Sequence, residues 1–253
     1  IVLYTQDSGV TWSSRPITAA VGYLGAASFP DSSTGYVANG GNRLLKTTDG
    51  GATWSARNPN LPGVDAIAFV DAQRGWIVSS DNARVIRTVD GGASWTASGA
   101  VTAQRIRSIH FAGASTGWMC GTTGVLFKSV DGGGSWSSRN SGTVVNLNMI
   151  RFRDAQNGIA VGDGGVIRGS SDGGETWTTR SLGASGTSQD LTAVTWTGSH
   201  WIVVGNGGVV YSSLDGSTWT SHSSGTTKSL GSVTWTGSRI VAVGDAAVIL
   251  SSP

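Results

Sequence analysis

The chain has 253 residues, of which 13% are charged, and its 17 Lys and Arg against 15 Asp and Glu give a net charge of +2. No basic run is long enough to follow a phosphate backbone, and no apolar run approaches the length of a membrane span, so neither a nucleic-acid partner nor a transmembrane segment is expected. Cys120 is the single cysteine, which excludes a fold held together by disulfides within the chain.

The sequence repeats a pattern of short apolar runs. In chain order, each repeat begins with an apolar run that ends in an aromatic residue and predicts the first of four short strands. The six runs are Ala26–Phe29, Ala66–Phe69, Ser108–Phe111, Met149–Phe152, Ala193–Trp196 and Ser232–Trp235. A polar turn separates each of them from a second run that predicts another strand. These second runs are Tyr36–Ala38, Trp76–Val78, Trp118–Cys120, Ile159–Val161, Trp201–Val203 and Ile240–Ala242.

A turn rich in Gly, Asn and Asp leads to a third run in each period. The third runs are Arg43–Lys46, Arg84–Arg87, Val125–Lys128, Val166–Arg168, Val209–Tyr211 and Val248–Leu250, with a seventh, Ile1–Tyr4, at the start of the chain. The motif S/T-x-D-x-G-x-S/T-W follows and turns the chain into a fourth strand that begins at its Trp. Short strands bounded by such turns predict an antiparallel meander, and no stretch has a helical period.

The motif that precedes the fourth strand recurs along almost the whole chain. Its Asp and Trp residues are Asp7 and Trp12, Asp49 and Trp54, Asp90 and Trp95, Asp131 and Trp136, Asp172 and Trp177, and, in a copy one residue shorter, Asp215 and Trp219. The period is therefore 41 to 43 residues. A repeat of that length marks a unit that buries its apolar face only by stacking against its neighbours.

Repeated four-stranded antiparallel units predict an all-β fold, a single β-propeller domain over residues 1–253. The repeats begin near residues 24, 64, 106, 147, 191 and 230. Six blades are favoured, with residues 1–15 completing the last blade so that the two ends of the chain join in one sheet. One of the seven runs predicted to form third strands is then left over, so seven blades are the alternative.

Each residue type of the motif has a structural use. The Asp carboxylate can accept hydrogen bonds from backbone N–H groups a few residues later, Gly can adopt positive φ, and Ser or Thr ties the hairpin. The Trp offers a large apolar plate for packing between blades. Six similar copies in different blades cannot all line one active site, so we expect the motif to be structural, with no metal or cofactor.

These motifs resemble the Asp-box, or bacterial neuraminidase repeat, over residues 5 to 219. The fuller unit, F-x-D-x-x-x-G-W followed by V-L/I-x-x-T-x-D-G-G-x-T-W, is most similar to the photosystem II stability and assembly factor-like propellers, and residues 69–95 and 111–136 carry it best. The resemblance implies a propeller that binds another protein as an assembly factor. Asp-boxes also occur in sialidases, endoglucanases and sorting receptors, so the box alone does not select a function.

The sequence gives little support for an enzymatic function. A sialidase-like site needs three arginines, a Tyr and a Glu, but the only Glu, Glu175, lies inside an Asp-box. A glycoside hydrolase needs two opposed carboxylates, and Asp65 and Asp190 are the only candidates at one mouth of the channel. They belong to blades expected to be far apart, so we predict a protein without enzymatic activity and keep glycoside hydrolysis as the alternative.

Recognition is expected at the mouth where the repeats differ most, because divergent loops on a rigid scaffold commonly bind partners. The candidate binding residues there are Tyr23, Arg105, Arg107, Asn146, Asn148, Arg151 and Asp190, with Asp81, Asn82 and Arg84 from neighbouring turns. Arginines beside amides suit an acidic peptide, a carboxylate or a sugar. The alternative is that these residues only solvate the channel entrance.

The predicted partner is another protein or a peptide, with a glycan as the second possibility, and the oligomeric state is left open. The 39 Gly residues and the scarcity of Lys and Glu are typical of turn-rich exported proteins. We therefore expect export to the periplasm, the cell surface or the medium.

Overall fold

The computed structural model describes residues 2–17, 24–39, 43–57, 63–79 and 83–252. Within these ranges the chain is built of β-strands, and its helical elements are single 3₁₀ turns. Contacts divide it into two compact units. The first unit comprises Ile1–Tyr4, Trp12–Met119 and Phe127–Ser137, and the second comprises Thr5–Thr11, Cys120–Leu126 and Ser138–Pro253.

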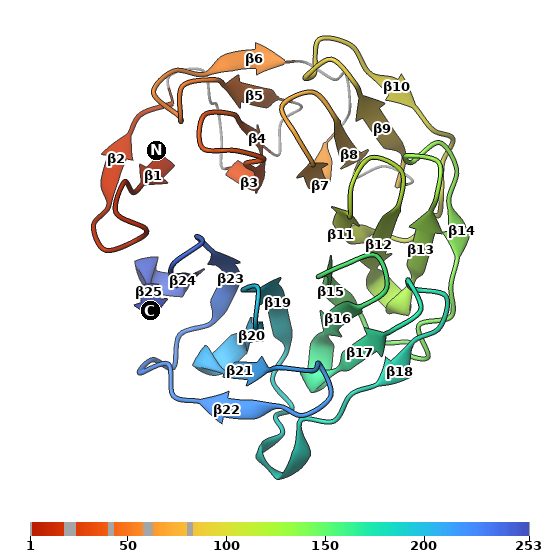
Figure 1. Cartoon of the computed structure of the whole chain (residues 1–253), viewed down its shortest axis with the longest axis vertical. Coiled ribbons are helices and arrows are strands. Elements are labelled where there is room, and N and C mark those ends of the chain that lie inside the picture. Colours follow the sequence, from red (N-terminus) through yellow and green to blue (C-terminus); the bar gives the residue numbers. More distant parts are fainter. Residues whose placement is uncertain (1, 18–23, 40–42, 58–62, 80–82, 253) are drawn as a thin grey trace. The chain divides into compact units, whose positions relative to one another are not determined.

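The first unit contains a two-stranded sheet and two complete blades (Figure 1). The two-stranded sheet pairs β1 (Val2–Tyr4) with β2 (Ser13–Arg15). Blade 1 consists of β3 (Leu24–Ser28), β4 (Gly35–Asn39), β5 (Leu44–Thr47) and β6 (Ser55–Arg57). Blade 2 consists of β7 (Val64–Phe69), β8 (Gly75–Ser79), β9 (Val85–Thr88) and β10 (Thr96–Ala97).

Blade 3 has strands in both units and consists of β11 (Ile106–Phe111), β12 (Gly117–Gly121), β13 (Leu126–Ser129) and β14 (Ser137–Ser138). The second unit contains the remaining blades. Blade 4 consists of β15 (Leu147–Phe152), β16 (Gly158–Gly162), β17 (Ile167–Ser170) and β18 (Thr178–Thr179), and blade 5 of β19 (Leu191–Trp196), β20 (Trp201–Gly205), β21 (Val210–Ser213) and β22 (Thr220–His222). Blade 6 has three strands, β23 (Leu230–Trp235), β24 (Ile240–Gly244) and β25 (Ile249–Ser252).

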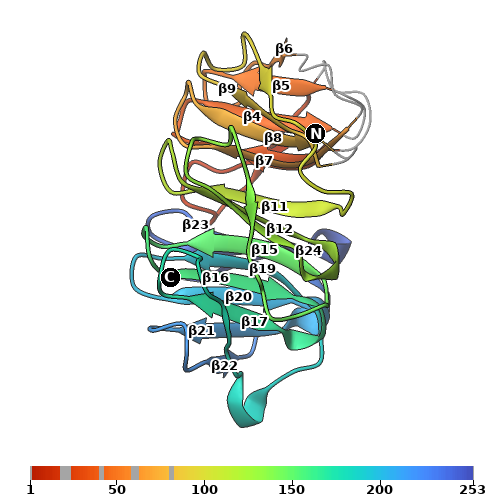
Figure 2. The same ribbon diagram turned by 90° about the vertical axis from the view of Figure 1, so that its right-hand side faces the viewer.

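The predicted fold class is confirmed: the protein is an all-β, six-bladed β-propeller made of antiparallel meanders. Within the second unit, β15 lies beside β19 and β19 beside β23, so the first strands of successive blades are neighbours (Figures 1 and 2). At the ends of the chain, β2 pairs with β1, and β25 pairs with β24. That residues 1–15 complete the last blade stays a prediction.

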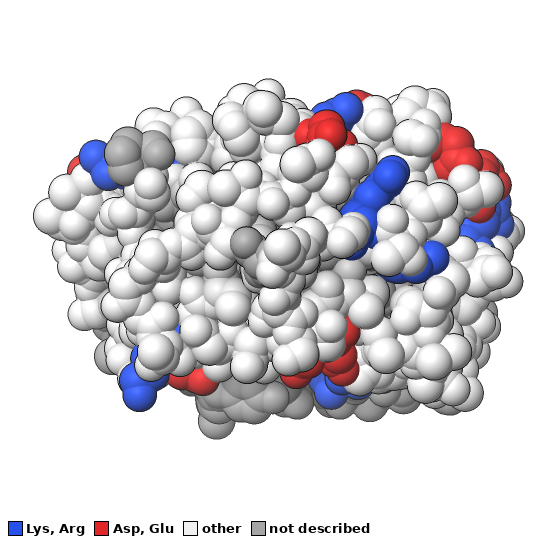
Figure 3. Space-filling model, turned by 90° about the horizontal axis from the view of Figure 1, so that it is seen from below, with Lys and Arg blue, Asp and Glu red and all other residues white. Residues whose placement is uncertain are grey.

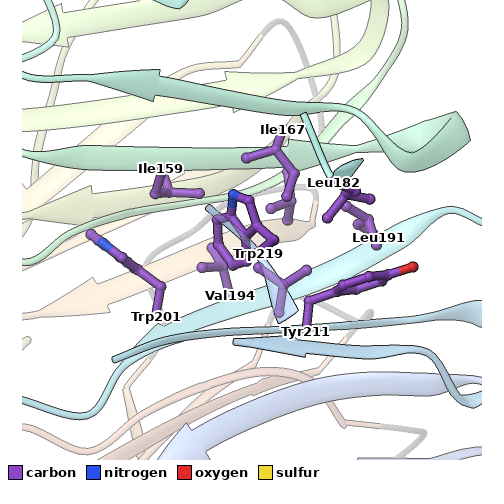
Figure 4. Packing of buried hydrophobic residues seen from close by; sticks show 10 residues of the cluster. Ile159, Ile167, Leu182, Leu191, Val194, Trp201, Tyr211 and Trp219 are labelled. Carbon is purple, nitrogen blue, oxygen red and sulfur yellow. The ribbon is translucent and has the colours of Figure 1, made fainter. Parts of the chain in front are cut away.

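The core lies between blades because the second strands of blades 2 to 5 are buried on both faces. In the second unit, Ile159 and Ile167 of blade 4 pack with Trp201, Tyr211 and Trp219 of blade 5 (Figure 4). The second strands are the most deeply buried, since every residue of β8, β12, β16 and β20 is buried. Strands covered on both sides read as nearly continuous apolar runs, which is why these segments were predictable.

The Asp-box turns are closed by their own side chains. Thr47 Oγ1 donates a hydrogen bond to Asp49 Oδ1 at 2.7 Å and accepts one from the Gly51 N–H at 2.8 Å. Thr53 donates its N–H to Asp49 Oδ1 and its hydroxyl to Oδ2, at 2.9 and 2.6 Å. The hydroxyl of Thr53 is the main reason that the pKa of Asp49 is lowered to about 2.

Two Asp-box turns in the first unit, those of Asp90 and Asp131, are also hydrogen-bonded to the preceding blade. The Tyr36 hydroxyl donates to the Ala72 carbonyl at 2.9 Å and lies 3.3 Å from the Gly91 carbonyl, to which Lys46 donates at 3.1 Å. One blade further on, Trp76 Nε1 and Arg87 both donate to the Gly132 carbonyl, at 2.8 and 3.2 Å. An aromatic residue on the second strand and a cation on the third thus form a seat for the hairpin of the next blade.

Candidate binding site

A β-bulge occurs at the same place in the first strand of five blades. The register against the second strand shifts at Gly25, Asp65, Asn148, Thr192 and Gly231. A bulge places one extra residue in the strand and changes the direction in which its side chain projects. The polar residues at these positions are therefore directed differently from the regular alternation of the sheet.

Two of the bulge residues link successive blades of the second unit. Asn148 Nδ2 donates a hydrogen bond to the Leu191 carbonyl of blade 5 at 2.9 Å. Thr192 Oγ1 donates in the same way to the Leu230 carbonyl of blade 6. Each bond satisfies a backbone carbonyl on the neighbouring first strand, so these side chains hold blades together.

Asn146 and Asn148 converge on Asp163, the first residue of the 3₁₀ turn η2 (Asp163–Gly165). Asn146 Nδ2 lies 2.7 Å from Asp163 Oδ2, and Asn148 Nδ2 lies 2.9 Å from Oδ1. Asn146 Oδ1 also accepts the N–H of Thr123, in the corresponding turn of blade 3, at 3.1 Å. The two amides predicted to bind a partner therefore lie together and are bonded within the protein.

Asp190 occupies in blade 5 the repeat position that Asn146 occupies in blade 4. Its Oδ1 accepts the N–H of Gly164, in the turn of the preceding blade, at 2.9 Å, and its Oδ2 accepts Asn206 Nδ2 at 3.3 Å. The residue before the first strand thus caps the turn of the preceding blade in both cases. Asp163 and Asn206, which the sequence analysis did not select, are signalled by the recurring Gly-Asp/Asn-Gly-Gly sequence before the third strand.

The arginines Arg105 and Arg107 belong to the first unit. Arg105 forms an ion pair with Asp65 of blade 2, with its Nη2 2.9 Å and its Nε 3.0 Å from Asp65 Oδ1. The Arg105 side chain is 66% exposed, whereas that of Asp65 is 4% exposed. Asp65 Oδ2 is buried and has no hydrogen-bond partner in the described part of the chain. Arg107 is exposed.

Arg151 is different because it lies on β15 with its Nε buried. Burial lowers the pKa of its guanidinium, since desolvation penalises the charged form. Tyr23, Asp81 and Asn82 lie outside the described residues. Arg84 is described, and its carbonyl accepts the Ser79 N–H at 2.9 Å in the turn between β8 and β9.

The candidate residues thus form one group in each unit. The first unit holds Arg105, Arg107 and Asp65, and the second holds Asn146, Asn148, Arg151 and Asp190. The two carboxylates considered for glycoside hydrolysis, Asp65 and Asp190, are each bonded within their own unit. Among the residues that the structure describes, no group of three or more His, Cys, Asp or Glu is placed to hold a metal ion.

The molecular surface carries few charges. Figure 3 shows one face on which Lys and Arg side chains are scattered among uncharged residues and lie near Asp or Glu in several places. No helix in the described ranges is long and apolar enough to cross a membrane. Local recognition by a few side chains is more compatible with this surface than binding through an extended charged field.

Comparison with known proteins gives the family. A family profile described as Photosynthesis system II assembly factor YCF48 matches residues 58–143 and residues 140–227, which together exceed half of the chain. The chain belongs to this family. The resemblance read from the Asp-box units is thereby confirmed. No curated protein sequence matches the chain significantly.

Solved structures of the YCF48 family have the same fold. YCF48 from Cyanidioschyzon merolae has a TM-score of 0.80 and 20% identity, covering 98% of this chain and 87% of that one. A structure described as YCF48 bound to D1 peptide has a TM-score of 0.72 and 21% identity, covering 90% of this chain and 78% of that one. An ancestral GH74 enzyme has a TM-score of 0.70 and 16% identity, covering 93% of this chain but 37% of that one.

Proposed function

We propose that the chain is a non-enzymatic binding propeller that recognises a protein or peptide segment through Arg105 and Arg107. The observation that carries this proposal is the similarity to a YCF48 structure described as bound to a D1 peptide, which covers 90% of this chain. Family membership supports a role in which the bound segment is held rather than altered.

Within the candidate set, the arginines of the first unit fit this role best. Asn146, Asn148 and Asp190 are bonded to turns and carbonyls of their own unit, and the Nε of Arg151 is buried. Arg105 and Arg107 are exposed, and the ion pair with Asp65 fixes Arg105 in place. An exposed guanidinium held in one position can pair with a carboxylate of a peptide through two parallel N–H···O bonds.

Calorimetric titration with a D1 peptide tests the proposal. The double variant Arg105→Ala plus Arg107→Ala should weaken binding at least about tenfold, because a charge-assisted hydrogen bond contributes about 1.5–3 kcal/mol. Arg74→Ala is the matched control, since Arg74 is a half-exposed arginine paired with Asp71 in another turn of the first unit. Unchanged affinity in the double variant, with an unchanged circular dichroism spectrum, would reject the arginine site.

A carbohydrate-active propeller is the second candidate, and the fold shared with GH74 enzymes favours it. Assays of hydrolysis on β-glucans and sialosides separate the two. Turnover that disappears in Asp65→Ala or Asp190→Ala would replace the binding proposal with a glycoside hydrolase.

A further inference from the structure

Two Asn-Gly sequences lie wholly within the described residues, Asn157-Gly158 in blade 4 and Asn206-Gly207 in blade 5. In an Asn-Gly sequence the backbone nitrogen of the Gly can attack the side-chain carbonyl carbon of the Asn, because Gly has no side chain to block the approach. The two sequences therefore share one chemistry. A difference in their reactivity must come from the fold around them.

The fold holds Asn157-Gly158 firmly in place. Asn157 Nδ2 donates to both carboxylate oxygens of Asp154, at 3.0 and 2.9 Å, and the Asn157 N–H donates to Asp154 Oδ1 at 2.7 Å. Gly158 is buried at the start of β16, where it pairs with Phe152 on one side and Ser170 on the other. Attack at Asn157 would require its amide to leave Asp154 and Gly158 to leave the sheet.

Asn206-Gly207 is held much less firmly. Asn206 is the first residue of the 3₁₀ turn η4 (Asn206–Gly208), which joins β20 to β21. Its Nδ2 donates to Asp190 Oδ2 at 3.3 Å, which is longer than the bonds that Asn157 makes. Gly207 is exposed and has a positive φ of 67°. Its backbone nitrogen is therefore accessible to solvent, which can remove the proton.

The N–H of the second turn residue is capped in blades 3 and 4 but not in blade 5. In blades 3 and 4 it donates to the side chain just before the first strand of the next blade, which is Asn146 or Asp190. The residue at that position in blade 6 is Ser229, whose shorter side chain makes no such bond within the described part of the chain. The Gly207 nitrogen thus lacks the cap that its counterparts have.

We propose that Asn206 is a deamidation site and that its reaction loosens the turn η4. The Gly207 nitrogen, after losing its proton, attacks Asn206 Cγ. The new C–N bond closes a succinimide ring, and the side-chain nitrogen of Asn206 takes up a proton and leaves as ammonia. Water then adds to one of the two ring carbonyls and opens the ring to aspartate or isoaspartate. One water is consumed and one ammonia is released, with no oxidation or reduction.

The neighbouring carboxylate of Asp190 gives this reaction a structural consequence. Deamidation replaces the Nδ2 donor with a carboxylate oxygen that faces Asp190 Oδ2, and two like charges in contact disfavour each other. Asp190 also accepts the Gly164 N–H of blade 4, so the repulsion acts on the turn of the preceding blade as well. Isoaspartate adds a carbon atom to the backbone, which disturbs the bond of 3.5 Å from the Val209 N–H to the Asn206 carbonyl.

Peptide mapping by mass spectrometry measures both sites in one sample of the full chain. The folded protein is incubated in mildly alkaline buffer, and trypsin then places the two sites in separate peptides, residues 154–168 and 181–228. Asn206 should deamidate at least about tenfold faster than Asn157, because attack at Asn157 must first break several hydrogen bonds. In urea, where the fold is lost, the two sites should react at similar rates.

Three variants separate the reaction from its effect on the turn. Gly207→Ala should slow deamidation of Asn206 severalfold; a Cβ there would come no closer than 3.7 Å to Gln189, and Ala246 has the same place in blade 6 with a φ of 55°. Asn206→Asp reproduces one product and should lower the urea midpoint and speed hydrogen exchange at Gly164. Asn206→Ser removes the amide without adding a charge and should do both to a smaller extent.

Equal rates at Asn157 and Asn206 in the folded chain, a difference that persists in urea, or an unchanged rate in Gly207→Ala would each overturn the assignment of the site. Equal stability of Asn206→Asp and Asn206→Ser would overturn the loosening of the turn. The variant Arg105→Ala plus Arg107→Ala should deamidate at the native rate, which keeps this test separate from the proposed function.

Discussion

At the scale of single residues, an Asp carboxylate closes each Asp-box hairpin, and the amide of Asn148 links blades 4 and 5. Asp49 accepts bonds from Thr47 and Thr53, which makes its ionised form part of the turn. Asn148 bridges Asp163 and the Leu191 carbonyl, which makes its amide donor part of two blades. Protonation of Asp49 would remove the hydrogen bonds to its carboxylate. Substitution of Asn148 would remove the bonds that its amide donates.

The Asp-box carboxylates should make stability depend on acid pH. Hydrogen bonds from Ser or Thr side chains and from backbone N–H groups lower the pKa of Asp49, Asp131 and Asp172 from 3.8 to about 2. A lowered pKa in the folded state adds stability above the unfolded value of 3.8, and that stability is lost as the pH falls toward 2. We expect the thermal midpoint to fall across this window. A triple Asp→Asn variant at these positions should flatten the fall, and an equal fall in both proteins would contradict the assignment.

Asn148 provides a second test at this scale. Asn148→Ala should lower the free energy of unfolding by about 1–3 kcal/mol, because it leaves a buried carbonyl without its donor. Asn148→Asp should lower it further, since a carboxylate cannot donate to Leu191 and would lie against Asp163. Urea unfolding measures both, with Thr220→Ala on the exposed strand β22 as a control expected to change little. Equal stability of the Ala and Asp variants would argue against the bond to Leu191.

At the scale of elements, the strands and turns were largely predictable and the use of the loop residues was not. The apolar composition of runs such as Trp76–Val78 predicts that they are buried strands. The spacing of Asp, Gly, Ser or Thr, and Trp in the Asp-box predicts a turn. Asn146 and Asp190 appear in the sequence as polar loop residues before a strand, which suits binding equally well. Their bonds to the turns of preceding blades depend on contacts about 20 residues or more apart, which spacing alone does not reveal.

The Trp residues of the Asp-boxes differ in whether the indole N–H is hydrogen-bonded, and this difference leads to a prediction. Trp177 Nε1 donates to the Gly174 carbonyl at 3.2 Å, whereas Trp219 Nε1 is buried with no hydrogen-bond partner in the described chain. Trp177→Phe removes a hydrogen bond in addition to apolar area, so it should destabilise by about 1 kcal/mol more than Trp219→Phe. Thermal or urea unfolding of both variants checks the difference, and the reverse order would show that packing outweighs the indole N–H.

At the scale of the whole molecule, the blades differ in how completely they are covered. The second strand of blade 5 is buried throughout, while Val243 in the second strand of blade 6 is 39% exposed. Local opening is easiest where few apolar contacts must be broken. The second strand of blade 6, β24, is therefore expected to open more often than β20.

Hydrogen exchange measured by mass spectrometry tests this expectation. Backbone amides of β24 should exchange faster than those of β20, although the two strands occupy the same place in the repeat. The comparison is internal, because both strands belong to one unit and pair on both sides. Similar protection in both strands would mean that the exposure of Val243 has no effect on local stability.

The hairpins also carry information about the order of folding. The bonds inside an Asp-box span two to four residues, as from Thr47 to Asp49 and Gly51, whereas those that fasten one blade to the next span about forty, as from Asn148 to Leu191. Short loops close within microseconds and distant segments meet far more slowly. Each Asp-box turn can therefore form before the neighbouring blade packs against it. The register of each hairpin is then set by local contacts, without a search among distant segments.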